Sequence, residues 1–225
     1  MKVLLACEES QSVCKEFRKL GHQAFSCDVL PTSGDNPEWH IQDDVFNVIK
    51  NDNWDMMIAF PPCTHLAVSG ARHFKKKIKD GRQKEAIEFF KKLWSVDEWA
   101  NIKHICIENP VGVMSTNLRP PDQIIHPYYF GDPYSKKTCL WLKNLSPLVH
   151  ISELDQLELG YDKNKITHTH KGEFVTFSSG KRMAKWYHES KDKSGHLRSK
   201  TFPGIAKAIA EQFSKQIEHS GKLII

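Results

Sequence analysis

Short apolar runs with the character of buried strands alternate along this chain with stretches of helical periodicity. The expected elements are strands at residues 2–6, 23–27, 55–60 and 104–107, and helices at 10–20, at 82–94 and from Pro203 onward. Strands and helices in this order are typical of an α/β protein with a doubly wound, mostly parallel sheet.

At 225 residues the chain is long enough for one domain with a substantial core, together with a small lobe. A boundary is expected near residue 147, at the Leu-Ser-Pro stretch. We expect a cofactor-binding and catalytic domain over residues 1–147 and a small basic lobe over 148–200. Residues 201–225 are expected to form a C-terminal helix that returns to the catalytic domain.

Positive charge is concentrated in residues 163–200. This segment carries ten Lys or Arg against three acidic residues, a local charge of +7 in a chain whose formal total is +5. Phe174, Phe177, Trp186 and Tyr187 are interleaved with these cations. Cations beside aromatic side chains suit a phosphate backbone and unstacked bases, so the segment predicts nucleic-acid binding. A solvated, lysine-rich loop region is the alternative.

The use of cysteine and the length of the apolar runs indicate a soluble, cytoplasmic protein. Six cysteines in no regular framework are typical of reduced thiols in a cytoplasm. The sequence has no Cys-x-x-Cys pair, and the Thr-His-Thr-His stretch at 167–170 is by itself a poor metal site, so no metal is expected. No segment approaches the roughly 20 apolar residues that span a bilayer, so no membrane partner is expected.

A thiol and a carboxyl group follow two of the expected strands. Pro61, Pro62 and Cys63 come directly after the third apolar run, and Glu108 comes directly after the fourth. In an open α/β sheet, residues just past the carboxyl ends of the strands face the ligand crevice. Cys63 and Glu108 are therefore candidates for a nucleophile and its acid partner. The alternative for Cys63 is a buried structural thiol, the role expected of the other five cysteines.

Four segments resemble, in order along the chain, the motifs of the cytosine-5 DNA methyltransferases, most of all the short, phage-type branch. They are Phe60 to Gly70, with its Pro-Cys and Ser-Gly pairs, Glu108-Asn109-Pro110, residues 129–138, and the closing segment 201–209. The resemblance spans most of the chain. It implies a Rossmann-like, class I S-adenosylmethionine-dependent methyltransferase fold and S-adenosylmethionine as the cofactor.

The resemblance also implies a course for the reaction. The Cys63 thiolate adds to carbon-6 of cytosine and makes carbon-5 nucleophilic, while Glu108 stabilises the negative charge that arrives at ring nitrogen-3. Carbon-5 then takes the methyl group, a base removes its proton, and elimination releases Cys63. Lys136 or Lys137 stands in the place of a catalytic arginine of the family, although lysine lacks the bidentate fork of arginine.

The cofactor half of the expected site begins at the turn after the first strand, where relatives place glycines that this chain lacks. Asp28 has the chemistry to accept hydrogen bonds from ribose hydroxyls, and Asp44 resembles the acid that meets the adenine amino group. A turn or a helix cap is the alternative for either aspartate. The residues assigned to the cofactor are Ala6, Cys7, Glu8, Ser10, Asp28, Asp44, Phe60 and Pro61.

DNA is the implied substrate, either a duplex whose target base is flipped out or a single strand. About fifty residues, 148–198, stand where the family has its target-recognition region, so we expect short or relaxed recognition dominated by phosphate contacts. The basic run at 75–79 is expected to clamp DNA or to form a solvated helix end. The residues assigned to the substrate are Asn109, Pro62, Ser69, Arg72, Lys181 and Arg182.

Two further functions stay open. The same Cys63 and Glu108 chemistry would act on a free pyrimidine nucleotide, or would use a modified S-adenosylmethionine as the donor. The basic segment argues mildly against a mononucleotide. The other function is that of a catalytically idle DNA-binding module that retains the fold, to which replacement of Cys63 by serine would make no difference.

Overall fold

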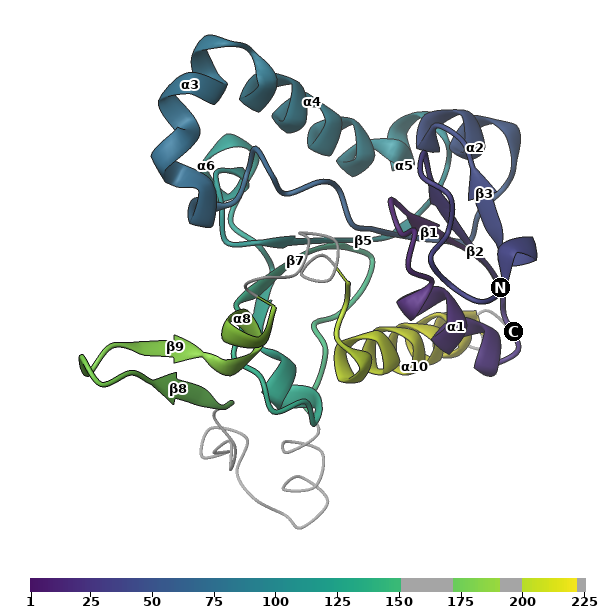
Figure 1. The fold of residues 1–225 in the computed structure, drawn as a ribbon. Helices are drawn as coiled ribbons and strands as arrows, with labels where there is room; N and C mark the ends of the chain where they lie inside the picture. Colours follow the sequence, from purple (N-terminus) through teal and green to yellow (C-terminus); the bar gives the residue numbers. More distant parts are fainter. Residues whose placement is uncertain (151–171, 191–199, 222–225) are drawn as a thin grey trace. The chain divides into compact units, whose positions relative to one another are not determined.

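The computed structural model describes residues 1–150, 172–190 and 200–221 (Figure 1). The chain divides by its internal contacts into two units. The first unit is Met1–Ile124 with Thr138–Pro147, and the second is Ile125–Lys137 with Leu148–Ile225. The functional division at residue 147 stays a prediction.

Within the described residues, seven strands form one sheet in the order β3-β2-β1-β4-β5-β7-β6 (Figure 1). The strands are β1 (Lys2–Ala6), β2 (Gln23–Asp28), β3 (His40–Gln42), β4 (Met56–Ala59), β5 (His104–Pro110), β6 (Gln123–Ile125) and β7 (Thr138–Lys143). Neighbours from β3 to β5 pair in parallel, and β7 pairs antiparallel to β5. The expected α/β class with a mostly parallel sheet is confirmed, and the arrangement is compatible with a Rossmann-like fold.

The central strands are buried on both faces. All four residues of β4 are buried, as are the last four of β1. Parallel strands covered by helices on both sides have this continuous apolar character, which explains why their sequences do not alternate between apolar and polar residues. A continuous apolar run therefore correctly indicates each of these strands.

The strand at 104–107 is longer than expected and continues through Glu108 to Pro110. The reason is its antiparallel partner, because Glu108 pairs with Leu140 and Pro110 with Thr138. The sequence analysis did not anticipate β7, and so it ended β5 where the apolar run ends. β1 has its expected bounds, β2 is one residue longer, and β4 lacks the expected first and last residues.

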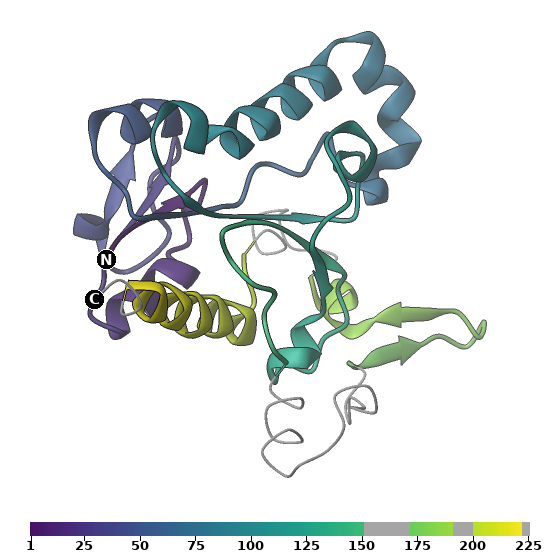
Figure 2. The same cartoon turned by 180° about the vertical axis from the view of Figure 1, so that it is seen from behind.

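The helices of the first unit lie on both faces of the sheet. They are α1 (Ser12–Lys19), η1 (Pro37–Trp39), α2 (Val45–Asn51), η2 (Val68–His73), α3 (Phe74–Lys79), α4 (Arg82–Trp94), α5 (Val96–Trp99) and α6 (Met114–Asn117). Figures 1 and 2 show α4 and α5 on one side of the sheet and α1 on the other. Phe90 of α4 meets Trp141 of β7 edge to face at 5.1 Å, and Phe89 meets Phe46 of α2 at 5.3 Å.

The helix α4 has the predicted bounds, whereas α1 is shorter than predicted. Gln11 has a φ of 58° and cannot belong to a right-handed helix, so α1 begins at Ser12. At the other end Gly21 takes a φ of 83° and its amide donates to the Arg18 carbonyl at 2.9 Å. Glycine adopts this left-handed conformation without steric cost, and so it ends the helix.

The second unit contains η3 (Pro127–Phe130), the hairpin of β8 (Phe174–Thr176) and β9 (Arg182–Ala184), α8 (Lys185–Glu189) and α10 (Pro203–Gly221). Two hydrogen bonds hold its parts to the segment after η3. The Trp186 indole donates to the Ser135 carbonyl at 2.8 Å, and the Gly204 amide donates to Asp132 Oδ2 at 2.9 Å. The predicted start of the final helix at Pro203 is confirmed.

Residues 1–150, 172–190 and 200–221 lack two kinds of structural feature. No helix among them is long and apolar enough to cross a membrane. They contain no group of three or more His, Cys, Asp or Glu side chains placed to hold a metal ion. The Thr-His-Thr-His stretch at 167–170 lies outside the described residues.

Candidate active site

The two predicted catalytic segments lie at the carboxyl ends of neighbouring strands. The Pro-Pro-Cys segment follows β4, whereas the Glu-Asn-Pro segment forms the last three residues of β5. β4 and β5 are parallel, with Ala59 opposite Ile107 in the register. The next residues, Phe60 just past β4 and Glu108 still within β5, therefore lie at the same level along the two strands. The structure thus brings the Pro-Pro-Cys segment and the Glu-Asn-Pro segment to one edge of the first unit, at the position where open α/β sheets bind ligands.

Asn109 joins the two segments directly. Its side-chain Nδ2 donates to the Pro61 carbonyl at 2.8 Å, and the residue is only 2% exposed. Its Oδ1 is also buried, and no hydrogen-bond partner for it occurs among the residues that the structure describes. The hydrogen bond to Pro61 sets the distance between the end of β5 and the segment that carries Cys63.

Cys63 lies on a tight turn and is partly exposed. Its carbonyl accepts from the amides of Leu66, at 3.0 Å, and Ala67, at 2.9 Å. Pro62 and Thr64, its immediate neighbours, are exposed. This is the environment of a turn at the edge of the sheet and not that of a core thiol.

Four of the other cysteines are buried, in contrast to Cys63, and Cys7 is partly exposed. Burial raises the pKa of both the Cys14 and the Cys27 thiol to about 12, and it raises the pKa of Cys106 well above its ordinary value. A thiol with a pKa of this kind stays protonated at neutral pH and is a poor nucleophile. The buried cysteines therefore belong to the core, as expected.

Glu108 is partly exposed on β5. Its carboxylate contributes, after burial, to the raised pKa of Cys106, which lies two residues earlier on the same strand. Side chains two apart on a strand share one face, so Glu108 continues the face on which Cys106 is buried. The carboxyl group thus stands where that face meets the edge of the sheet.

The chain after Cys63 is fastened to the chain after Glu108. The Val68 amide donates to the Val111 carbonyl, and the Val113 amide donates to the Leu66 carbonyl, both at 3.0 Å. Gly112 lies between these contacts, and a Cβ atom on it would stand 2.3 Å from the Leu66 carbonyl oxygen. The close approach requires glycine, so residue 112 fixes how near the two segments lie.

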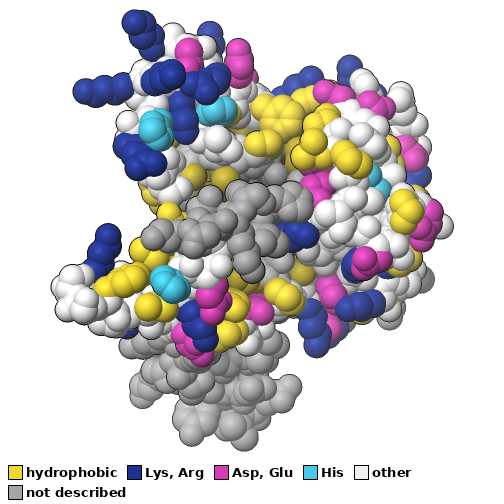
Figure 3. Space-filling model, viewed as in Figure 1, with side chains coloured by type: hydrophobic (Ala, Val, Ile, Leu, Met, Phe, Trp, Pro, Cys, Tyr) yellow, Lys and Arg dark blue, Asp and Glu magenta, His cyan; other side chains and the backbone are white. Residues whose placement is uncertain are grey.

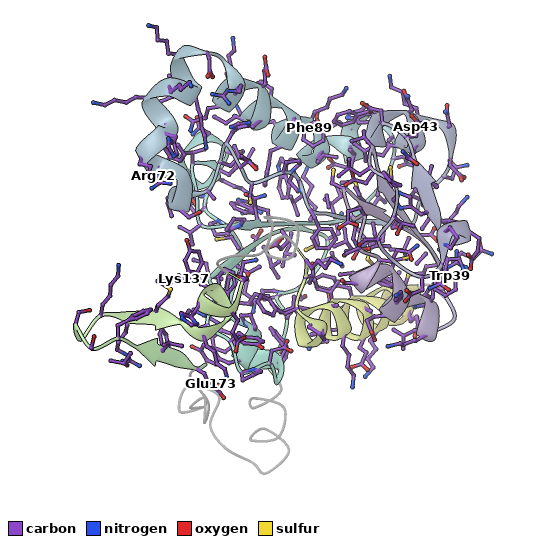
Figure 4. All side chains as sticks on the ribbon, viewed as in Figure 1. Trp39, Asp43, Arg72, Phe89, Lys137 and Glu173 are labelled. Atoms are coloured by element: carbon purple, nitrogen blue, oxygen red, sulfur yellow. The ribbon has the colours of Figure 1, made fainter. Side chains whose placement is uncertain are left out.

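Ser69 and Arg72, assigned to the substrate, lie exposed on η2 after the Cys63 turn. Arg72 is labelled in Figure 4. Arg72 Nε donates to the ring of His73 at 2.9 Å. The space-filling view shows Lys and Arg side chains gathered over α3, the helix that follows (Figure 3). Three of its four lysines, at positions 75, 76 and 79, are exposed.

Residues assigned to the cofactor also come together. Burial, followed by the charges of Asp28 and Asp44, raises the pKa of the Cys7 thiol, so both carboxylates lie near the turn after β1. Asp28 Oδ1 accepts from the Leu30 amide at 3.0 Å, and Asp44 Oδ1 accepts from the Phe46 amide at 2.8 Å as the N-cap of α2. Both aspartates therefore have the turn and cap roles that were the alternative.

These local hydrogen bonds involve only one carboxylate oxygen of each aspartate. Within the described residues, no hydrogen bond reaches Oδ2 of Asp28 or of Asp44. Val29 and Leu30, directly after Asp28, are 68% and 54% exposed. An available carboxylate oxygen beside exposed apolar side chains fits the sugar and the base of a nucleoside. The residues present thus suit the nucleoside part of S-adenosylmethionine.

Side-chain hydrogen bonds stabilise the turn after β1, which contains no glycine. Glu8 Oε1 accepts from the Val13 amide at 2.6 Å and Oε2 from the Cys14 amide at 3.2 Å, at the start of α1. Burial raises the pKa of Glu8 to about 8, against the opposing effect of these amides. Gln11 is fully buried and exchanges two hydrogen bonds with the Asn36 backbone. The turn is thereby held by its own side chains.

Three other residues assigned to the cofactor, Ala6, Ser10 and Phe60, form hydrogen bonds within the fold. Ala6 is buried at the end of β1, and its carbonyl accepts from the Phe60 amide at 2.9 Å. Ser10 Oγ hydrogen-bonds Ser12 Oγ at 3.0 Å. Phe60 therefore links the ends of β1 and β4, which are the strands that carry the cofactor turn and the Cys63 turn.

A surface hollow of about 690 Å³ lies away from these residues. It is lined from α1 and η1, with Arg18 and Trp39 among its residues, and it includes Gln23, the first residue of β2. The hollow thus adjoins the amino end of β2, whereas Asp28 is at the carboxyl end. None of the residues assigned to catalysis, cofactor or substrate lines it.

Four predicted site residues belong to the second unit. The Lys136 ammonium lies 5.5 Å from the centre of the Trp186 ring and 5.6 Å from that of Phe202. Lys137 is exposed, as are Lys181 and Arg182 on the hairpin. Of the ten basic residues counted in segment 163–200, those at 163, 165, 171, 191, 193 and 198 lie outside the described residues.

The sequence analysis missed Lys77 and Gln83, two polar side chains buried behind the Cys63 turn. Lys77 is 8% exposed and Gln83 is 7% exposed. In the sequence, Lys77 is one member of a basic run, and nothing there distinguishes it from its neighbours. Gln83 stands early in a helix where a glutamine is ordinarily solvated, so no local signal pointed to either residue.

No protein-family model matches the chain, and no similar sequence is found among curated proteins. The chemical interpretation of this site therefore rests on its residues and their arrangement.

Proposed function

We propose that this protein methylates carbon-5 of cytosine in DNA, with S-adenosylmethionine as the methyl donor. The observation that carries the proposal is the junction of the Cys63 and Glu108 segments at the ends of β4 and β5, tied by the hydrogen bond from Asn109 to Pro61. A partly exposed thiol and a partly exposed carboxyl group at one sheet edge are the two groups that this reaction needs.

The chain's own residues would act as follows. The Cys63 thiolate adds to carbon-6 of cytosine, and a proton held by Glu108 meets the negative charge that develops at nitrogen-3. Carbon-5 thereby becomes an enamine-like nucleophile. The bound donor supplies an electrophilic methyl group. Loss of the carbon-5 proton to a base then allows the sulfur–carbon bond to break and returns Cys63 as a thiolate.

The cofactor would be held beside the turn after β1. Asp28 offers a carboxylate oxygen to the ribose hydroxyls, Asp44 offers one to the adenine amino group, and the exposed Val29 and Leu30 offer apolar surface. These residues stand at the carboxyl ends of parallel strands, where nucleotide-binding α/β proteins hold their ligands.

DNA is supported as the substrate by the cations near the Cys63 turn. Arg72 and the exposed lysines of α3 follow that turn along the chain. The second unit, considered by itself, carries the exposed Lys181 and Arg182 on its hairpin. Several exposed Lys and Arg side chains of this kind can contact DNA phosphates, and phosphate contacts supply most of the affinity when a protein binds DNA without sequence specificity.

The test is to incubate the purified protein with DNA and S-adenosylmethionine and to measure 5-methyldeoxycytidine by mass spectrometry of the nucleosides. Cys63→Ser and Glu108→Gln should each abolish the product. Glu98→Gln, which changes an exposed glutamate on α5 in the same way, should retain it.

Different failures have different meanings. Product formation that persists in Cys63→Ser would overturn the covalent mechanism. No product on any DNA, with S-adenosylmethionine shown to bind, would reject DNA methylation and leave a nucleotide substrate or a modified donor. No product and no binding of S-adenosylmethionine would leave a DNA-binding module.

A further inference from the structure

Lys77 differs from the other lysines of α3 because its side chain is buried. Only 8% of it is exposed, whereas Lys75, Lys76 and Lys79 are exposed. Removing an ammonium group from water is costly unless polar partners replace the water. A lysine in such a place therefore has contacts that favour its burial.

The partner of Lys77 is the turn that carries Cys63. The Lys77 Nζ donates to the carbonyl oxygen of Thr64, the residue directly after the cysteine. The ring of Phe74 lies 5.9 Å from the ammonium and adds a weak cation–π contact. In the described part of the chain, no carboxylate forms a salt bridge with Lys77. Its charge is therefore directed at the Cys63 turn.

Gln83 of α4 makes the neutral counterpart of this contact. Its Nε2 donates to the His65 carbonyl at 3.1 Å, and its side chain is 7% exposed. The backbone carbonyls of Thr64 and His65, the two residues after Cys63, thus each accept a hydrogen bond from a buried side chain, one charged and one neutral. The pair separates two effects, since Gln83 can only anchor the turn, whereas Lys77 also brings a positive charge to it.

We propose that Lys77 is a positioning residue for Cys63, holding its turn and stabilising the thiolate form through a buried positive charge. The inference rests on the proposed function, in which Cys63 is the nucleophile. A cation near a thiol lowers its pKa, and burial keeps the interaction from being screened by salt.

Other ionisable groups flank the same turn and set the background for this effect. His65 lies within the turn, Arg72 and His73 follow on η2, and Glu108 lies in β5, two residues before the strand ends. Arg72 and His73 are exposed, so solvent weakens their influence. An ionised Glu108 would oppose the thiolate, and the buried cation of Lys77 would offset that repulsion in the free protein.

The experiment measures the rate at which iodoacetamide alkylates Cys63 in the native, full-length protein as a function of pH, followed by peptide mass spectrometry. Lys77→Gln keeps a hydrogen-bond donor and removes the charge, and Lys77→Met removes both. Lys79→Gln is the matched control on an exposed lysine of the same helix, and Gln83→Leu removes anchoring alone.

We expect the pH midpoint of Cys63 alkylation to rise by about one unit in Lys77→Gln and Lys77→Met, a roughly tenfold slower reaction below the midpoint. Lys79→Gln and Gln83→Leu should leave the midpoint unchanged. The buried Cys14 and Cys106 report the fold in the same digest, because they react only when the protein opens.

An unchanged midpoint in Lys77→Gln, with Cys14 and Cys106 still protected, would overturn the proposal. Reaction of both buried cysteines in both neutral variants would also overturn it, because Lys77 would then have a structural role only. The measurement needs neither DNA nor a methyl donor. A shifted midpoint in a protein that methylates nothing would therefore reject the proposed function and keep the role of Lys77.

Discussion

The side-chain amide of Asn109 donates to the carbonyl oxygen of Pro61 at 2.8 Å, across 48 positions of the sequence. Both residues are buried; Pro61 lies two residues before Cys63, and Asn109 directly follows Glu108. The polypeptide before Cys63 and the polypeptide after Glu108 are therefore held by one hydrogen bond that neither segment could form alone.

Asn109→Ala should lower the free energy of unfolding by about 1–3 kcal/mol, because it leaves the buried Pro61 carbonyl without its donor. Urea unfolding measures the loss. The control is Asn117→Ala, which removes an exposed amide that donates to the Val113 carbonyl at the same 2.8 Å. An equal decrease in the free energy of unfolding in the two variants would show that the buried Asn109 hydrogen bond stabilises the fold no more than an exposed one.

Gly112→Ala should be more damaging than alanine at an unconstrained glycine. The new Cβ would stand 2.3 Å from the Leu66 carbonyl oxygen, so the Cys63 turn or β5 would have to move. Gly81→Ala is the comparison, since nothing lies within 4 Å of its Cβ position and its cost is the left-handed φ of 82°, about 1–2 kcal/mol. Thermal unfolding compares the two variants. If Gly112→Ala were the milder change, the close approach of the two segments would not be a constraint.

Glu8→Gln should change how stability depends on pH. The pKa of Glu8 is raised to about 8 in the folded protein, so between its ordinary value of 4.5 and 8 the folded state binds a proton that the unfolded state has lost. In this window the stability of the parent protein should fall with rising pH by up to about 1.4 kcal/mol per unit relative to Glu8→Gln.

Urea unfolding of the parent and of Glu8→Gln at pH 5, 6, 7 and 8 tests this expectation. The exposed Glu98→Gln serves as the control and should follow the parent at every pH. Parallel stability curves for the parent and Glu8→Gln would mean that the carboxyl of Glu8 ionises in its ordinary range despite its burial.

Replacing Lys181 and Arg182 by glutamine should weaken DNA binding and reduce its salt dependence. For every phosphate that the protein no longer neutralises, the slope of log affinity against log salt becomes shallower by about 0.9 on duplex DNA. Fluorescence anisotropy at several salt concentrations measures the slope. Lys50→Gln, an exposed lysine of α2, should leave it unaltered. A slope unchanged in the double variant would remove the hairpin from the DNA-binding surface.

Local patterns predicted much of the fold. The apolar runs located β1 and β4, and the helical spacing located α4 and the start of α10 with the bounds that the structure has or close to them. These elements are specified by short-range periodicity, because a strand buried on both faces and a helix with one apolar face have sequences that differ from each other.

The sequence predicted the residues of the candidate site but not the hydrogen bonds and strand pairing that hold them together. Cys63 could be placed just past β4, and Glu108 near the carboxyl end of β5, from the apolar runs alone. The extension of β5 through Pro110 could not, because its partner Thr138 is far along the chain. The cap that Glu8 forms for α1 was also invisible, since the sequence showed only the absence of glycines from the turn.

By itself the sequence determined the class of fold and the two groups proposed for catalysis, since apolar periodicity and residue type are local properties. Only the tertiary structure decided that Asn109 joins their segments and that Lys77, alone among the lysines of α3, is buried behind the Cys63 turn. Burial and long-range hydrogen bonding depend on which elements pack together, and identical residues in one basic run acquire different environments only when that packing is complete.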